Sequence, residues 1–208
     1  MDVELFGVRI STGQATKIRS TREGALHVVQ HLPPYAVLSA LGGVVRVDCT
    51  SDVASVVAIP TTTAMLTVWN GDTERSYVID KLIASIWDVN NNDEGQITIV
   101  SCLHPVGMAQ PSAQDLTPKK MNGNGSYGGN AWCDVGATVI DNGWQPWDSM
   151  NITNLSDDAI PGGSVIADIE GRIVLPPRAG LSMSVLSDAV AQTVKCAMSW
   201  FEVYLDLG

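Results

Sequence analysis

The glycines of residues 123–128, which spell Gly-Asn-Gly-Ser-Tyr-Gly, come closest to a cofactor-binding motif in this sequence. In dinucleotide-binding loops the same spacing follows a strand and opens a helix, whose first turn faces the pyrophosphate. An acidic residue about twenty positions later contacts the ribose, and Asp148 stands at that distance. Here, however, a polar segment precedes the glycines, and a strand-like segment, residues 131–140, follows them. We therefore predict a loop without a cofactor.

Two groups of residues have the composition of a metal site. His27 and His31 are four residues apart, a spacing that would let them bind zinc from one face of a helix. Their segment has the pattern of a strand, where this spacing separates the side chains by roughly 13 Å. Residues 88–94 resemble a calcium-binding loop, but Asp93 and Ile99 replace the glycine and the bidentate glutamate that it requires. We predict no bound metal at either place.

The sequence contains no GxSxG nucleophile elbow and no HExxH zinc motif, so we predict no catalytic residues and no enzymatic activity. Three tryptophans, Trp132, Trp144 and Trp147, offer a different chemistry, because flat aromatic rings can stack on sugars. Tryptophans in loops also anchor the loop or contact another subunit. These residues are therefore glycan-stacking candidates, with anchoring as the competing interpretation.

The charge of the chain restricts its partners. It carries 22 acidic and 12 basic residues, a formal net charge of -10, which repels phosphates. We predict neither a nucleic-acid partner nor a membrane partner, because no apolar run reaches the roughly 18 residues of a membrane span. The first residues lack the pattern of a signal peptide, and the four cysteines form no CxxC pair. We expect reduced, structural thiols in a protein made in the cytoplasm.

Short runs of alternating apolar and polar residues dominate the chain, and this period of two is typical of β-strands. Roughly nine or ten such runs, separated by turns rich in glycine and proline, predict an all-β fold, an antiparallel β-sandwich that is jelly-roll-like. A closed β-barrel is the competing all-β expectation. The length suits a single domain, which we place at residues 1–208.

Residues 171–186 and 193–207 form the clearest pair of predicted strands, joined by a hairpin at residues 187–192. The side chains expected to face inward are Met183, Val185, Cys196, Met198 and Trp200. The apolar positions change from even to odd numbers after Trp200, so we expect a β-bulge or a change of partner near residues 201–202. The final residues would then leave the main sheet.

Three segments without strand periodicity are predicted to be irregular. Residues 11–23 would be a polar arm or loop, and residues 108–130, rich in glycine, proline and asparagine, would be the longest loop. Residues 144–158 would be a loop with aromatic anchors. Residues 35–41 are predicted as a short helix that ends at Gly42-Gly43, with a strand as the alternative.

Several segments resemble, in style and layout, those of small virion proteins of tailed bacteriophages. They are residues 21–28 (TREGALHV) followed by the apolar residues 35–41, residues 77–82 (YVIDKL), and the closing residues 173–177, 181–184 and 199–203. The layout is similar to that of the jelly-roll decoration, or cement, proteins of the outer capsid surface. The resemblance spans most of the chain.

The resemblance implies a non-enzymatic capsid protein, commonly a homotrimer, that binds the major capsid protein and staples neighbouring capsid subunits. It would act in the virion, on the outer capsid surface. Lys17, Arg19 and Arg22, the basic residues of the polar arm, are the candidates for pairing with acidic groups of a capsid subunit. The alternative is a carbohydrate-binding module of a phage receptor-binding or fibre protein, using the three tryptophans above.

Overall fold

The computed structural model describes residues 6–8, 15–17, 35–49, 53–88, 95–123, 126–136, 143–152, 163–188 and 192–204. These divide into two compact units, Met1–Ala36 and Val37–Gly208. In the first unit, β1 (Phe6–Val8) pairs antiparallel with β2 (Ala15–Lys17). The predicted polar arm at residues 11–23 therefore contains a strand at residues 15–17, because backbone pairing needs no apolar face.

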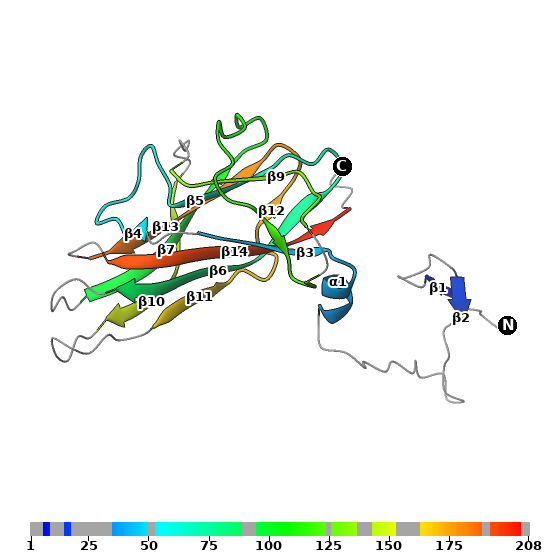
Figure 1. The fold of residues 1–208 in the computed structure, drawn as a ribbon, viewed down its shortest axis with the longest axis horizontal. Helices are drawn as coiled ribbons and strands as arrows, with labels where there is room; N and C mark the ends of the chain where they lie inside the picture. Colours follow the sequence, from blue (N-terminus) through cyan, green and yellow to red (C-terminus); the bar gives the residue numbers. More distant parts are fainter. Residues whose placement is uncertain are drawn as a thin grey trace. The chain divides into compact units, whose positions relative to one another are not determined.

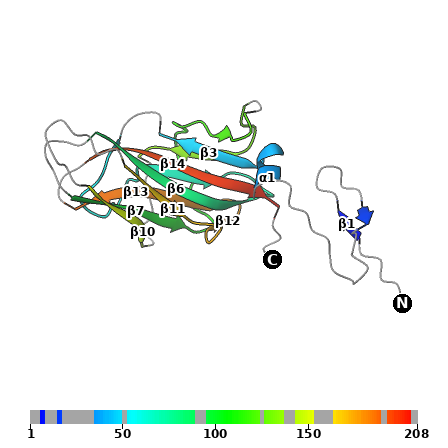
Figure 2. The same cartoon turned by 90° about the horizontal axis from the view of Figure 1, so that it is seen from below.

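The second unit is an antiparallel sandwich of two sheets (Figures 1 and 2). The five-stranded sheet has the order β10 (Gln145–Ile152), β7 (Gly95–His104), β13 (Gly180–Ser187), β5 (Leu66–Asn70), β9 (Ala131–Asp134). The seven-stranded sheet has the order β11 (Ser164–Asp168), β6 (Ser76–Asp88), β14 (Thr193–Val203), β3 (Val44–Asp48), β8 (Lys119–Lys120), with β12 (Val174–Leu175) beside β6 and β4 (Val53–Ala54) beside β14. The predicted all-β sandwich is confirmed.

The short connections between the long strands cross from one sheet to the other, which corrects the predicted hairpin. β13 lies in the five-stranded sheet and β14 in the seven-stranded sheet, although only residues 188–192 join them. The links from β5 to β6 and from β6 to β7 also change sheets. Facing sheets lie about 10 Å apart, a gap that roughly three extended residues span. Turn composition therefore does not decide between a hairpin and a crossing.

The core lies between the sheets and confirms the predicted inward-facing set. Each of those side chains is buried: Met183, Val185, Cys196, Met198 and Trp200. The Trp200 ring stacks on the ring of Tyr77, with centroids 5.7 Å apart. This contact joins β14 to β6 at the centre of the seven-stranded sheet.

A β-bulge lies just before its predicted position. Opposite Ser199 and Trp200 the pairing skips Asp80, so the extra residue belongs to β6 and not to β14. Apolar side chains of β6 point inward on both sides of this bulge because it resets the period of two. The prediction that β14 leaves the sheet is wrong up to Val203, which still pairs with Ser76. Residues 205–208 lie outside the described residues.

Two predicted loops contain more structure than their composition indicates. Residues 145–152 form β10, so the loop predicted from residue 144 onward is a strand in this part. Within residues 108–130, β8 pairs with β3, and Leu116 forms a bridge with Cys133. Leu116 is buried, so this segment packs on the sandwich.

The predicted helix at residues 35–41 is confirmed as α1 (Ala36–Ala40). It ends in the Gly42-Gly43 turn, where Gly42 has a φ of 75°, a conformation that glycine adopts without strain. The amide of Gly43 donates to the carbonyl of Leu38 at 3.0 Å, which satisfies one of the last carbonyls of the helix. This turn leads directly into β3.

We predict that Trp200→Ala lowers the free energy of unfolding by about 3 to 5 kcal/mol, because it removes a fully buried ring and the stacking contact of that ring with Tyr77. Denaturant titration of the variant and the wild type measures the difference. The matched control is Trp132→Ala, since Trp132 is only half-buried at the edge of the other sheet and should cost less. A loss below about 1 kcal/mol for Trp200→Ala would contradict its central role.

Candidate functional site

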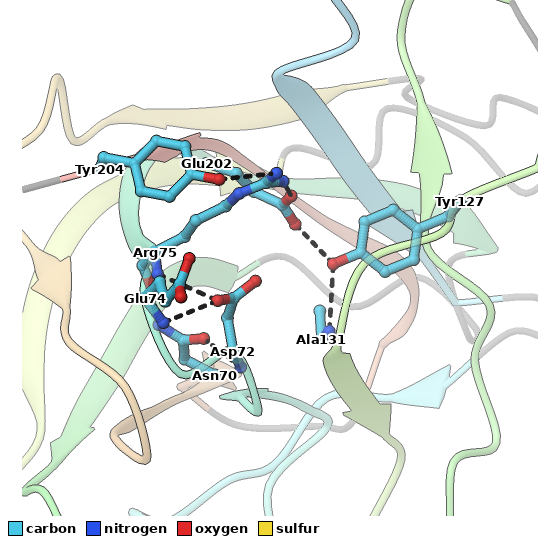
Figure 3. Close-up of polar contacts among 8 residues, drawn as sticks. All are labelled: Asn70, Asp72, Glu74, Arg75, Tyr127, Ala131, Glu202 and Tyr204. Atoms are coloured by element: carbon cyan, nitrogen blue, oxygen red, sulfur yellow. Dashed lines mark hydrogen bonds and ion pairs between the residues drawn. The ribbon is translucent and has the colours of Figure 1, made fainter.

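A tight turn at residues 70–75 presents Arg75 at the end of the sandwich next to α1 (Figures 1 and 3). Asp72 Oδ1 accepts hydrogen bonds from the amides of Glu74 and Arg75, at 2.9 and 3.0 Å. The Asn70 side chain donates to the carbonyl of Arg75 at 2.9 Å and to that of Leu175 at 2.8 Å. Short polar side chains that bond to nearby backbone in this way fix turns, so the position of Arg75 is set before any ligand arrives.

Arg75 joins a network with three other side chains at the end of β14 (Figure 3). Its guanidinium lies 3.4 Å from Glu202 Oε2 and donates to the Tyr204 hydroxyl at 3.2 Å. The guanidinium carbon also lies 5.1 Å from the centre of the Tyr204 ring, a cation–π distance. The Tyr127 hydroxyl donates to Glu202 Oε1 and accepts the amide of Ala131 at 3.0 Å. Both carboxylate oxygens of Glu202 are therefore occupied.

This network forms one wall of a surface hollow of about 450 Å³. Its other walls are the end of α1, the Gly42-Gly43 and Gly128-Gly129 backbones and the side chain of Lys120. Large apolar side chains lie exposed at this end: Val37, Leu41, Met121 and Tyr204. We call these four residues the apolar rim. Exposed apolar side chains that border a hollow are typical of a binding surface.

The network at the hollow is held by burial and by pairing of its side chains. Burial raises the pKa of Tyr127 and of Tyr77 well above the usual range, so both phenols stay protonated at neutral pH. Glu202 is held by a cation and by a phenol. The hydrogen bond to Tyr204 raises the pKa of Arg75, so its charge is fixed. Charged groups beside exposed apolar side chains are features that a binding surface can use.

The nearest approach to a catalytic arrangement is a buried row of polar side chains in the five-stranded sheet. His104 Nε2 lies 2.7 Å from Ser182 Oγ, which lies 2.8 Å from Thr67 Oγ1. All three residues are fully buried, so a substrate cannot reach the serine. The hydroxyls here satisfy one another within the fold.

Asp115 and Asp134 form an unusual acidic pair where residues 108–130 meet β9. The adjacent pair, Leu116 and Cys133, exchanges a backbone hydrogen bond of 3.1 Å, so the two aspartates occupy a non-hydrogen-bonded position, where opposite side chains are closest. Asp134 is 5% exposed, and its Oδ1 has no hydrogen-bond partner among the described residues. Burial, reinforced by Asp115, raises the pKa of Asp134.

Two carboxylates are fewer than the six to eight oxygens that a calcium ion takes. Within the described ranges, no three His, Cys, Asp or Glu side chains are grouped as a metal site would require. His27, His31 and residues 89–94 lie outside those ranges. After Gly128 and Gly129 the chain enters β9 at Ala131, so the glycine-rich segment does not open a helix as a dinucleotide site would.

The three tryptophans do not form one platform. Trp132 lies in β9 at one edge of the five-stranded sheet and Trp147 in β10 at the other edge, with three strands between them. Trp144 immediately precedes β10 and donates from Nε1 to the carbonyl of Pro60 at 2.9 Å. Trp147 Nε1 donates to Ser101 Oγ at 2.7 Å. These bonds fit the anchoring interpretation for Trp144 and Trp147.

The capsid-docking candidates are only partly described. Lys17 is the last residue of β2 in the first unit, while Arg19 and Arg22 lie outside the described residues. Sequence reasoning did not single out Arg75, Tyr127 or Glu202. Glu202 was the one sequence feature that could have indicated this network, because it is an acidic residue inside the apolar run that ends β14. An acidic residue in a buried strand needs a partner.

Fold and site together define an antiparallel β-sandwich with a preformed surface hollow at one end. No protein-family model, curated protein or solved structure matches the chain. No helix in the described part of the chain is long and apolar enough to span a membrane. The site's geometry therefore carries the functional argument.

We predict that Arg75→Met lowers the free energy of unfolding by roughly 1 to 3 kcal/mol, because the side chain of Glu202, 5% exposed, loses its cation. The double variant Arg75→Met/Glu202→Gln should lose less than the sum of the single variants. Denaturant titration measures all three. The control is Arg172→Met, whose partner Glu170 is exposed, and which should cost about 0.5 kcal/mol or less. Equal losses for the two arginine variants would contradict the network.

We predict that Asp134→Asn stabilises the protein at neutral pH by up to about 1 kcal/mol, because it removes one of two opposed like charges. The pKa of Asp134 is higher in the folded protein than in the unfolded chain. Asp134 therefore contributes to the free energy of unfolding at acidic pH, where it is protonated. This contribution is lost as the pH rises through the pKa that Asp134 has in the folded protein. Thermal unfolding measured from acidic to neutral pH should show that the stability of Asp134→Asn relative to the wild type increases with pH.

The exposed Asp148 supplies the control, since Asp148→Asn makes the same change of charge at an exposed position. A pH-independent gain, or an equal gain in Asp148→Asn, would show that the total charge of the protein is responsible and not the aspartate pair.

Proposed function

We propose that this protein is a non-enzymatic structural protein that docks on a protein assembly through the α1 end of its sandwich. The observation that carries the proposal is the hollow bordered by the apolar rim, with Arg75 and Lys120 beside it. Apolar side chains supply burial on contact, and the cationic side chains of Arg75 and Lys120 supply orientation toward acidic groups of a partner. The side chains that hold Arg75 in place are already bonded, so the surface is preorganised.

The assembly that best fits the chain is the outer surface of a tailed-phage capsid, where the protein would bridge neighbouring copies of the major capsid protein. Support comes from the resemblance of the sequence to phage decoration proteins and from the antiparallel sandwich that those proteins share. The net charge of -10 favours the outer surface, because it repels packaged DNA. The basic residue Lys17 in β2 belongs to the N-terminal unit, which offers a second contact to acidic groups.

Self-association as a homotrimer belongs to the same proposal. Only 16% of the residues are charged, and several large apolar side chains lie exposed on the sandwich. Stable oligomer contacts are apolar and often bury more than about 2,000 Å². Light scattering at micromolar concentration should show a species about three times the 22.1 kDa of the chain. A species of one chain's mass would remove the trimer from the proposal and leave docking on the assembly to be tested separately.

We predict that Leu41→Lys weakens binding to capsids that lack the protein by tenfold or more, since about 1.4 kcal/mol of lost apolar contact suffices. Co-sedimentation with such capsids over a range of concentrations measures the binding. The matched control is Val57→Lys, which places the same charge on an equally exposed apolar residue. Val57 lies near the β4 end of β14, whereas α1 lies near the opposite end of that strand. Circular dichroism checks that both variants fold.

Three results would contradict the proposal. Wild-type protein that does not sediment with capsids removes the capsid partner. Equal weakening by both lysine variants removes the α1 end as the docking surface. Salt-sensitive binding to DNA by the intact protein removes the outer-surface placement. Glycan binding that is lost in Trp144→Ala and Trp147→Ala would favour the carbohydrate-binding alternative instead.

A further inference from the structure

Cys49 and Cys196 lie directly opposite each other on neighbouring strands of the seven-stranded sheet. Cys49 follows the last residue of β3, and Cys196 lies within β14. The register of the two strands pairs Asp48 with Ala197, so the next pair along is Cys49 with Cys196. The amide of Cys49 donates to the carbonyl of Cys196 at 2.9 Å, which identifies a hydrogen-bonded pair.

This position matches the geometry of a disulfide. The Cα atoms of a hydrogen-bonded antiparallel pair are about 5.5 Å apart, which lies inside the range of about 4.4 to 6.8 Å that disulfides bridge. Both side chains point to the same face, because residues directly opposite in a sheet always do. The spacing of the two strands therefore falls within the range that a disulfide bridges.

The two thiols are already in contact and are chemically unequal. Both are free and buried. The hydrogen bond from the Cys196 thiol lowers the pKa of Cys49, and the same contact raises the pKa of Cys196. Cys49 is therefore the better nucleophile of the pair, and it lies at the end of its strand, where opening is easiest.

The other two cysteines have no such neighbour. Cys102 pairs in register with Ser182, and Cys133 pairs with Val68. Cys102 and Cys133 are fully buried, and Cys49 and Cys196 are nearly so. They are internal controls, because they share burial with the pair but lack an opposing thiol.

We propose that Cys49 and Cys196 form an oxidation site, which hydrogen peroxide converts into a disulfide between β3 and β14. The Cys49 thiolate attacks one peroxide oxygen, the O–O bond breaks, and Cys49 becomes a sulfenic acid while hydroxide leaves and takes up the thiol proton as water. The Cys196 sulfur then attacks the Cys49 sulfur, forming the S–S bond and releasing a second water, which carries the Cys196 proton. Two thiols are oxidised and one peroxide is reduced to two waters.

The bond would strengthen a weakly supported part of the sandwich. β3 is flanked by β14 on one side and, on the other, by β8, which is only two residues long. α1 directly precedes β3 in the chain. A disulfide at the far end of β3 closes a loop that contains most of the sandwich, and such long loops gain the most from cross-linking. The inference does not depend on the proposed docking function.

The test treats the full-length folded protein with hydrogen peroxide, blocks free thiols with an alkylating reagent, and maps the peptides by mass spectrometry. We expect one cross-linked pair of peptides, containing Cys49 and Cys196, with a mass lower by two hydrogens and lost on reduction. Two of the four thiols should then remain free to react with the alkylating reagent after denaturation. The midpoint of thermal unfolding should rise by roughly 5 °C or more after oxidation.

Two variants make the test specific. Cys49→Ala should abolish the cross-link and the rise in the unfolding midpoint, whereas Cys133→Ala, a matched buried variant, should retain both. Four alkylated thiols in peroxide-treated wild-type protein would overturn the proposal. So would stable oxidation of Cys49 without a bond to Cys196, or a cross-link that involves Cys102 or Cys133. The wild-type peptide map decides the question even if a variant fails to fold.

Discussion

The antiparallel pairing of β6 with β14 is the contact on which the rest of the sandwich depends. These strands, of 13 and 11 residues, are the longest in the fold and pair along their whole length. β11 and β12 attach to β6, while β3 and β4 attach to β14. The stacked rings of Tyr77 and Trp200 cover the inner face of this ladder. Losing this pairing would therefore divide the larger sheet into two parts, one built on β6 with β11 and β12 and one built on β14 with β3, β4 and β8.

The candidate site is a product of the same ladder. Arg75 immediately precedes β6, and Glu202 and Tyr204 lie at the end of β14, so antiparallel pairing brings them together. The bulge at Asp80 sets the register that aligns these two strand ends. Tyr127 then reaches Glu202 from a segment far away in the sequence. The hollow is thus rigid on the side formed by the network, which suits recognition of a surface without rearrangement.

Most of the polar side chains of this fold that could react are held by burial or by hydrogen bonds. The serine and histidine that touch each other are sealed inside the five-stranded sheet, and burial raises the pKa of Tyr127 beside the hollow. What faces outward at the α1 end is apolar surface with fixed charge. The cysteine pair is the exception, since its two thiols lie in contact at the end of a short, weakly flanked strand. The proposed docking and the proposed disulfide would both be mechanical roles.

The sequence by itself determined most of the long strands, the inward faces of β13 and β14 and the short helix that ends at Gly42, because these follow from local periodicity and backbone preference. It indicated an irregularity near residues 201–202, whereas tertiary structure decided that residues 145–152 form β10 and that the bulge lies in β6. Tertiary structure alone decided which strands pair. The links after β5, β6 and β13 have the composition of hairpin turns yet cross between sheets, since a few residues suffice for either path. For the same reason the network of Arg75, Tyr127 and Glu202, and the opposition of Cys49 to Cys196, could not be predicted from spacing.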